Sequence, residues 1–178
     1  MAPNAVIFHG TGGSPEILWF RWLQRRLTDR GYSVEVPHYP EVNVEPIATF
    51  LPKVLAAHRF DRETVLVGHS GGAALLLAVL EHIETPVSQA ILVAGYHTEP
   101  NTSAEPVLQQ TYNWPAIKQN AGDLYFINST DDPYGCDAEQ ARFMFDRVGG
   151  TQIIRDDAHF GDYNQPYDTF ELVDRLIP

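Results

Sequence analysis

A serine between glycines stands at residues 68–72, where the sequence reads Gly-His-Ser-Gly-Gly. The apolar run 65–67 before it predicts a buried strand, and the Ala- and Leu-rich run 73–80 after it predicts a helix. A serine on so tight a strand-to-helix turn takes a strained backbone conformation, and glycines two residues away on either side remove a steric clash. The pattern therefore predicts a nucleophile elbow that exposes the hydroxyl of Ser70.

The base and the acid that such a serine needs must come from other loops. We interpret His69 as a packing residue, because its side chain leaves the turn in a different direction from Ser70. Three more loops, at 9–15, 129–133 and 156–161, follow predicted strands. Ligands bind outside the carboxyl ends of strands in open α/β sheets. The elbow and these loops supply Ser, Asp and His in the chain order of an α/β-hydrolase.

Two neighbouring carboxylates compete for the role of the acid. Asp131 and Asp132 both precede Pro133, which helps to define the turn. We favour Asp132 as the group that orients a histidine, and Asp131 as a turn-capping residue. An Asx turn without a catalytic role is the alternative for the pair.

One histidine has the position expected of the base. His159 lies in the short loop between the last predicted strand and the last predicted helix. His97 follows another predicted strand, could line the mouth of a pocket, and is the main competitor.

The glycine-rich loop at 9–15 fits an oxyanion site better than a phosphate site. It has no G-x-G-x-x-G spacing, and no Walker lysine follows it. We assign one oxyanion donor to the backbone N–H of Thr11, with Gly12 as the alternative. The N–H of Gly71, at the start of the elbow helix, is the second predicted donor.

Further residues near these loops could line a substrate pocket, although each residue type is more often part of a core. They are Trp19, Tyr96, His97, Tyr112, Trp114, Tyr134 and Phe160.

Alternating strand and helix patterns predict the elements that position these groups. The predicted strands are 5–8, 32–36, 64–67, 90–94, 124–128 and 151–155. The predicted helices are 16–30, with Ser14 as N-cap, then 46–58, 73–83, 107–112, 114–119, 138–148 and 167–176. This order predicts one domain over residues 1–178, a three-layer α/β/α sandwich with a mostly parallel six-stranded sheet.

The composition indicates which kinds of binding partner and which cellular compartment to expect. The chain has 178 residues, 44% of them hydrophobic, and a formal net charge of −11, so nucleic acid and anionic membranes are not expected partners. From the sequence we expect neither a signal peptide nor a membrane span. A single cysteine, Cys136, fits a reducing cytoplasm. The oligomeric state stays open, and a monomer is compatible with the sequence.

The chain resembles the small serine hydrolases related to retinoblastoma-binding protein 9. The similar motifs cover nearly the whole chain: His9-Gly10-x-Gly12-Gly13, Val67-Gly68-His69-Ser70-x-Gly72-Ala73, Trp114-x-x-Ile117-Lys118-x-Asn120, Ser129-Thr130-Asp131-Asp132-Pro133 and His159-Phe160. The resemblance implies a minimal α/β-hydrolase fold without a cap domain, a triad of Ser70, Asp132 and His159, and serine hydrolase activity. Two departures stand out. Tyr134-Gly135-Cys136 replaces a loop in which relatives usually have a proline, and no Leu-x-Cys-x-Glu segment is present, so binding to a retinoblastoma-type pocket does not carry over.

These observations predict a serine hydrolase that cleaves a small ester, thioester or amide through an acyl-enzyme. No cofactor is expected, and no metal either, because no Cys, His and carboxylate cluster has ligand spacing along the chain. The alternatives are a binding protein on a hydrolase scaffold and a different reaction, such as perhydrolysis, on the same triad.

Overall fold

The structure, a computed structural model, describes residues 2–101 and 103–178. Its six strands form one sheet in the order β2-β1-β3-β4-β5-β6, and every neighbouring pair is parallel. The strands are β1 (Asn4–Phe8), β2 (Ser33–Glu35), β3 (Thr64–His69), β4 (Gln89–Val93), β5 (Asp123–Ser129) and β6 (Thr151–Arg155). All six predicted strands are therefore present, within one or two residues of their predicted ends.

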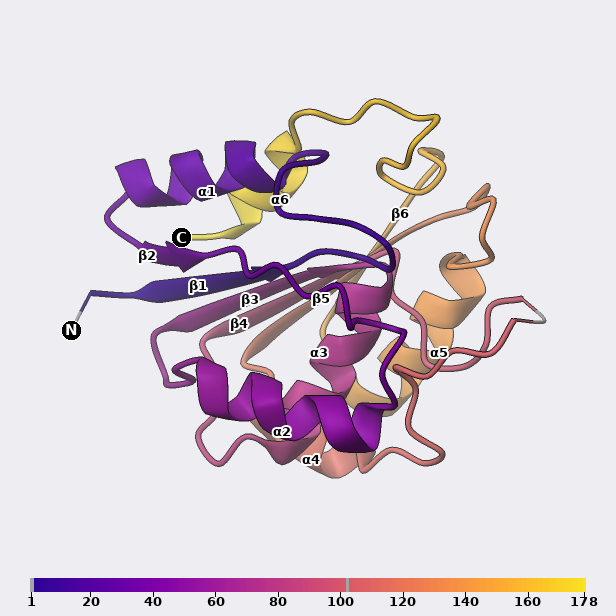
Figure 1. The fold of residues 1–178 in the computed structure, drawn as a ribbon, viewed down its shortest axis with the longest axis horizontal. Coiled ribbons are helices and arrows are strands. Elements are labelled where there is room, and N and C mark those ends of the chain that lie inside the picture. Colours follow the sequence, from indigo (N-terminus) through magenta and orange to yellow (C-terminus); the bar gives the residue numbers. More distant parts are fainter. Residues whose placement is uncertain (1, 102) are drawn as a thin grey trace.

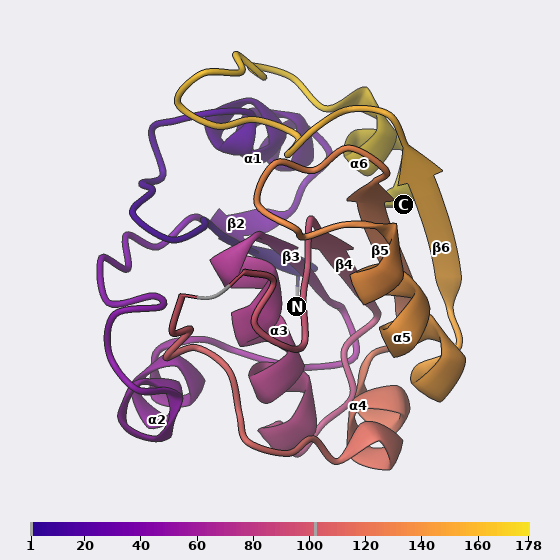
Figure 2. The same cartoon turned by 90° about the vertical axis from the view of Figure 1, so that its right-hand side faces the viewer.

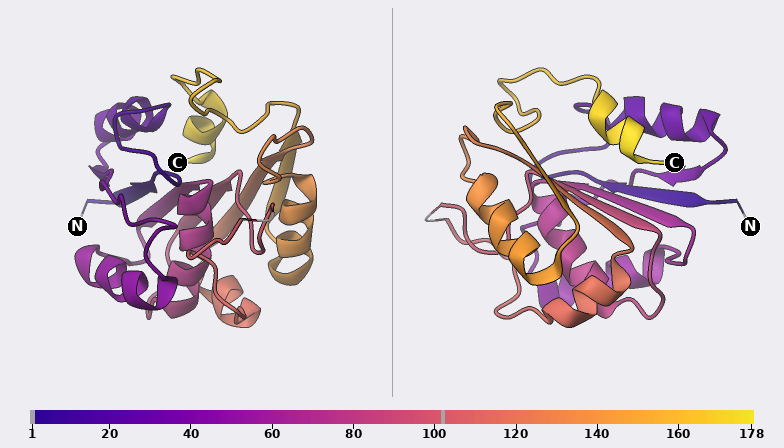
Figure 3. Two further views of the ribbon diagram at one scale, coloured as in Figure 1. Left: turned by 45° about the vertical axis from the view of Figure 1, so that its right-hand side comes forward. Right: turned by 180° about the vertical axis from the view of Figure 1, so that it is seen from behind.

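Helices cover both faces of this sheet, which confirms the predicted three-layer sandwich. Helices α1 and α6 lie on one face, and the other four helices lie on the opposite face (Figures 1 and 3). The helices are α1 (Phe20–Asp29), α2 (Ile47–Ala57), α3 (Gly71–His82), α4 (Trp114–Asn120), α5 (Ala138–Val148) and α6 (Glu171–Leu176). None of these described helices has both the length and the apolar character that crossing a bilayer requires.

Helix α3 forms the centre of the core. Ten successive residues, from Gly71 to Leu80, are buried, so the helix is enclosed on all sides. Apart from its two leading glycines, this stretch is Ala, Leu and Val throughout, which suits a helix without a solvent-facing side. The elbow serine thus stands at the end of the most deeply packed helix.

The first predicted helix begins later than its sequence suggests. Helix α1 starts at Phe20 rather than at residue 16, and its N-cap is Trp19, without a side-chain hydrogen bond, rather than Ser14. Leu18 takes a positive φ of 56°, which a right-handed helix does not accept. Two residues of the non-helical stretch, Ile17 and Leu18, line the cavity described below.

Of two other helix predictions, one is wrong and one is wrong in part. Residues 107–112 form a turn and bends and no helix, so that prediction is wrong; Asn43 from a distant loop accepts the backbone N–H of Val107 there. The last helix begins at Glu171 rather than at residue 167, and Tyr167 instead donates its hydroxyl to Asp157 at 2.7 Å. In both places a contact to another segment of the chain accompanies the non-helical backbone.

Figure 2 shows the sheet turned so that loops at the carboxyl ends of the strands face the viewer. The loops after β1, β3, β5 and β6 gather there. These are the loops in which the sequence predicts the oxyanion donors, the serine, the acid and the histidine.

Candidate active site

Ser70 has the strained backbone that the elbow motif predicts, with φ 55° and ψ −120°. The flanking glycines are required by close packing. A Cβ atom on Gly68 would lie 2.6 Å from the carbonyl oxygen of Gly72, and a Cβ on Gly72 would lie 2.4 Å from that of Phe8. These contacts are with backbone atoms, which cannot rotate away. The sequence therefore adopts this turn only with glycine at both positions.

The loops after β5 and β6 bring the predicted acid and base into contact. The Nδ1 atom of His159 lies 2.7 Å from Oδ2 of Asp132, and both side chains are almost fully buried. The other carboxylate oxygen of Asp132 accepts the backbone N–H of Tyr134 at 2.8 Å. The carboxylate is thus fixed on both sides and holds the imidazole in one orientation.

Asp131 binds the backbone of the same loop and does not touch the ring. Its Oδ1 atom accepts the backbone N–H of Ala158 at 2.9 Å. The hydroxyl oxygen of Ser129 accepts the N–H of Asp157 at 3.1 Å. Ala158 and Phe160 both have positive φ angles, so the loop is strained and needs these bonds to keep its shape.

His69 is buried beneath the site, in agreement with its interpretation as a packing residue. Its Nε2–H donates to the backbone carbonyl of His159 at 2.8 Å. Burial, and then the neighbouring His159, lower the pKa of His69 to about 3, so its ring stays neutral. His69 therefore also supports the base loop, a role that the sequence did not reveal.

The loop after β1 lies against the elbow. A Cβ atom on Gly10 would lie 3.1 Å from the Cβ of Ser70, and one on Gly71 would lie 3.2 Å from the backbone nitrogen of Thr11. Within the described residues, neither the Thr11 N–H nor the Gly71 N–H has a hydrogen-bond acceptor. Two backbone N–H groups without an acceptor among the described residues therefore stand side by side next to Ser70.

His9 holds this donor loop in place, which the sequence did not indicate. Its Nδ1–H donates to the carbonyl of Gly10 at 2.8 Å, and its Nε2 accepts the backbone N–H of Tyr39 at 2.9 Å. Burial lowers the pKa of His9, which favours this neutral form. The loop is thus anchored to the segment that follows β2.

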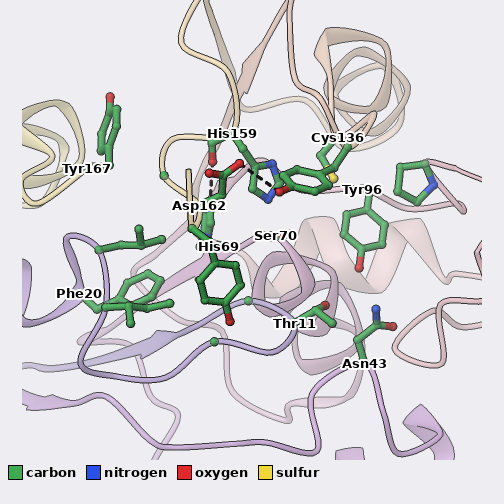
Figure 4. A pocket seen from close by; sticks show the side chains of 18 of the residues that line it. Thr11, Phe20, Asn43, His69, Ser70, Tyr96, Cys136, His159, Asp162 and Tyr167 are labelled. Atoms are coloured by element: carbon green, nitrogen blue, oxygen red, sulfur yellow. Dashed lines mark hydrogen bonds between the residues drawn. The ribbon is translucent and has the colours of Figure 1, made fainter. Parts of the chain in front are cut away.

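Ser70, Thr11 and His159 line one cavity of about 550 Å³. Figure 4 shows this cavity, with Ser70 and His159 near its centre. Two of the predicted pocket residues, Tyr96 and Tyr134, belong to its wall. The ring of Tyr134 packs edge-on against that of His159, with 4.6 Å between their centroids.

Two other predicted pocket residues belong to the core instead, so that expectation is wrong. Trp19 and Phe160 are fully buried. The indole N–H of Trp19 donates to the carbonyl of Phe160 at 3.1 Å, and the ring of Phe160 stacks on Phe170. Both residues fix the loop of His159 from below and do not reach the cavity.

His97 is not at the rim of this cavity either. It stacks on Phe143 with 3.6 Å between ring centroids and lines a separate hollow with Tyr112 and Trp114. Since Asp132 binds His159 and not His97, the geometry removes His97 as a competitor for the base.

Among the described residues, one group has atoms close enough to hold a metal ion. The ligand atoms of Asp132, Cys136 and His159 lie within 4.8 Å of one another. Spacing along the chain gave no sign of this group because its members come from two loops. Burial raises the pKa of the Cys136 thiol, which keeps it protonated.

Comparisons with known proteins identify the family of this chain. The model of the serine hydrolase family matches residues 5–176, so the chain belongs to that family. Among curated proteins, serine hydrolase RBBP9 of Rattus norvegicus is 28% identical over 138 residues, which cover 74% of this chain and 73% of the relative. The putative hydrolase YdeN of Bacillus subtilis is 28% identical over 137 residues, covering 74% and 72%.

Solved structures show the same fold. The ydeN gene product of B. subtilis superposes with a TM-score of 0.87 at 22% identity, over 98% of this chain and 96% of that one. Est1E of Butyrivibrio proteoclasticus, solved with ferulic acid, superposes with a TM-score of 0.66 at 14% identity, over 98% and 86%. The protein thus has a minimal α/β-hydrolase fold without a cap domain.

Proposed function

We propose that this protein hydrolyses a small ester, thioester or amide through an acyl-enzyme on Ser70. The observation that carries the proposal is the 2.7 Å contact between Nδ1 of His159 and Oδ2 of Asp132. His159 lines the same cavity as Ser70, and Ser70 has the strained backbone of a nucleophile elbow. Family membership supports a serine nucleophile. The substrate class and the role of each residue are our inference.

His159 is the proposed general base. A carboxylate accepts hydrogen bonds only, so Nδ1 of His159 carries the hydrogen that faces Asp132. In the neutral ring Nε2 is then free to take the proton of Ser70. Asp132 fixes this tautomer and stabilises the imidazolium that forms. His159 later returns the proton to the leaving group, and water deacylates the serine.

The oxyanion is held by two backbone donors in this proposal. The unpaired N–H groups of Thr11 and Gly71 flank Ser70, and they lie on a fixed loop and a helix N-terminus. Donors that are already oriented stabilise developing charge without reorganisation. A cavity of about 550 Å³ is of the size that binds small molecules.

A fluorophosphonate probe tests this proposal directly. We expect one label, on Ser70, which Ser70→Ala abolishes while the far-ultraviolet circular dichroism stays unchanged. Ser103→Ala is the matched control, because Ser103 lines the same cavity and lies outside the proposed triad. A label that mass spectrometry places on Ser14 or Ser129, or a protein that resists the probe, would contradict the proposal and favour a binding protein.

The substrate class requires a second measurement. A panel of p-nitrophenyl esters of graded chain length, together with aminoacyl arylamides, would show which acyl groups the cavity accepts. We expect turnover of small esters that disappears in Ser70→Ala and persists in Ser103→Ala.

A further inference from the structure

The wall of the cavity contains an acidic side chain that the proposed reaction does not use. Glu105 is half-buried and stands between two hollows: it lines the cavity that contains Ser70 and also the hollow of His97, which includes Arg147. Its Oε2 atom accepts two hydrogen bonds, from the Tyr96 hydroxyl at 2.6 Å and from the Asn43 side-chain amide at 2.5 Å. Its Oε1 atom has no hydrogen-bond donor within the described residues. One carboxylate oxygen is therefore fixed, and the other has no hydrogen-bond partner among the described residues.

The two donors are themselves held in place. The side-chain oxygen of Asn43 accepts the backbone N–H of Val107, and Asn43 takes a positive φ of 58°. Tyr96 is almost completely buried. The carboxylate of Glu105 is thus positioned before any ligand arrives, which reduces the entropy lost on binding.

The carboxylate of Glu105 has no ion-pair partner among the described residues, and Arg147 belongs to the lining of the other hollow. The described residues that line the cavity of Ser70 include no lysine and no arginine. Both bonds to Glu105 come from neutral groups. A carboxylate withdrawn from water needs a cationic partner or strong hydrogen bonds, so this site favours a ligand that brings positive charge.

Other groups around the cavity add to the negative potential. Asp162 and Asp168 line it, and His69 remains neutral because burial lowers its pKa. Burial acts to raise the pKa of Asp162, but hydrogen bonds from Asn164, Tyr134 and Gln165 outweigh it and lower the pKa. Asp162 therefore stays ionised at neutral pH, and the cavity repels an anionic substrate.

We propose that Glu105 binds a cationic nitrogen on the substrate, so that the enzyme prefers esters with a positively charged acyl or leaving group over anionic ones. This inference rests on the proposed function of Ser70. In the view of Figure 4, Thr11, Asn43 and Tyr96 lie on one side of Ser70, while Phe20 and Tyr167 lie on the other. The charged end of the substrate extends past Thr11, and an uncharged end occupies the side of Phe20.

A simpler role for Glu105 is to tie two loops together. It joins Asn43 to Tyr96, which lie on segments 53 residues apart in the sequence. A tie of this kind needs an acceptor but no charge, since glutamine offers a carbonyl oxygen to the same two donors. Glu105→Gln therefore separates the two roles.

The test uses p-nitrophenyl esters of graded chain length that end in a trimethylammonium group, in its uncharged tert-butyl isostere or in a carboxylate. At the best length we expect kcat/KM for the cationic ester to exceed that for the isostere by about tenfold, which corresponds to about 1.4 kcal/mol. The carboxylate ester should be the poorest. Glu105→Gln should remove this preference and leave kcat/KM for the tert-butyl ester within about twofold of wild type, because the cavity keeps its shape.

Glu99→Gln is the matched control. Glu99 is exposed, lies in the same connection between β4 and α4, and is not part of the cavity that contains Ser70. Its replacement removes one negative charge nearby and should preserve the preference for the cationic ester. A loss as large as in Glu105→Gln would mean that overall charge, and not this carboxylate, selects the substrate, and would overturn the inference.

The remaining outcomes distinguish the inference from the function on which it rests. Equal hydrolysis of the cationic and tert-butyl esters by the wild-type enzyme would overturn the inference and leave the hydrolase function intact. A preference for the cationic ester that persists in Glu105→Gln would overturn the inference and assign Glu105 to the tie between loops, because glutamine still accepts both hydrogen bonds. Absence of hydrolysis for every ester, with Ser70 unlabelled by the fluorophosphonate, would overturn the proposed function, and the inference with it.

Discussion

The carboxylate of Asp131 lies 2.9 Å from the backbone nitrogen of Ala158, the residue directly before His159. Its neighbour Asp132 binds the ring of His159 instead. Two adjacent acids in one turn thus hold the backbone and the side chain of the same loop. Their removal should have different consequences.

Replacement of the two acids by asparagine should separate these roles. We expect Asp132→Asn to lower kcat by at least about a hundredfold, because the amide no longer fixes the tautomer of His159; the corresponding change in a serine protease costs about 10⁴. Asp131→Asn should cost less, because an asparagine oxygen still accepts the N–H of Ala158. Steady-state hydrolysis of one p-nitrophenyl ester by both variants measures the difference. A larger loss in Asp131→Asn would reverse the assignment.

The elbow glycines should be intolerant of even a methyl group. Gly72→Ala would place Cβ 2.4 Å from the carbonyl oxygen of Phe8, in a layer of backbone that cannot yield. We expect a loss of at least about 2 kcal/mol in the free energy of unfolding, measured by urea denaturation. Gly31→Ala is the control, because its Cβ meets nothing within 4 Å and only its positive φ opposes the change. That strain costs about 1 kcal/mol. Equal losses would mean that the elbow relaxes more easily than its packing implies.

Protonation of the His97 imidazole should lower the free energy of unfolding in acid. Burial, and then the positive charge of Arg147, lower the pKa of His97 to about 4 in the folded protein, against about 6.5 in the unfolded chain. Between these values the unfolded state binds the proton and the folded state does not, so the free energy of unfolding falls as the pH drops from about 6.5 toward 4.

His97→Phe tests this sign, since phenylalanine keeps the stack on Phe143 and cannot be protonated. We expect the variant to lose less stability than wild type between pH 7 and pH 5, measured by urea denaturation at each pH. Its hydrolytic rate should stay near that of wild type, because His97 lies outside the cavity of Ser70. Identical pH profiles of stability would contradict the lowered pKa, and a loss of most of the activity would return His97 to the reaction.

Trp19→Phe should lower the stability of the protein and loosen the loop 156–161, which contains His159. The variant loses the donor to the carbonyl of Phe160 and leaves that buried oxygen unpaired, at a cost of about 1 to 3 kcal/mol. Trp22→Phe is the control, because Trp22 is only half-buried and its indole N–H has no such acceptor. Thermal unfolding compares the two. We also expect kcat to fall in Trp19→Phe only, since His159 directly precedes Phe160. Equal effects of both changes would argue against the specific role of this hydrogen bond.

Local patterns were enough to predict much of this protein. The alternation of apolar runs and helical patterns located all six strands, since strand and helix periods differ and need no knowledge of the fold. The run 65–80 identified the elbow around Ser70 because its two glycines and its flanks are contiguous. The order Ser70, Asp132, His159 then followed from one rule, that the carboxyl ends of parallel strands meet at the same edge of a sheet.

Side-chain direction was decided by the tertiary structure. Trp19 and Phe160 looked like pocket aromatics, yet both are buried in the core, and Leu18 and Phe160 take positive φ angles that no local pattern indicates. The same holds for Asp131 and Asp132, which are chemically identical and adjacent. Only the path of the loop after β6 determines which of the two meets the ring of His159.

The sequence by itself determined which reactive side chains are present, their order along the chain and the parallel sheet whose loops hold them, because residue type and periodicity are properties of short segments. The three-dimensional structure alone decided which groups meet. Glu105 accepts a hydrogen bond from Asn43, 62 residues earlier in the chain, and one from Tyr96. No spacing or motif connects these three residues, since their contact depends on how two loops fold over the end of β3 and on the burial that fixes them there.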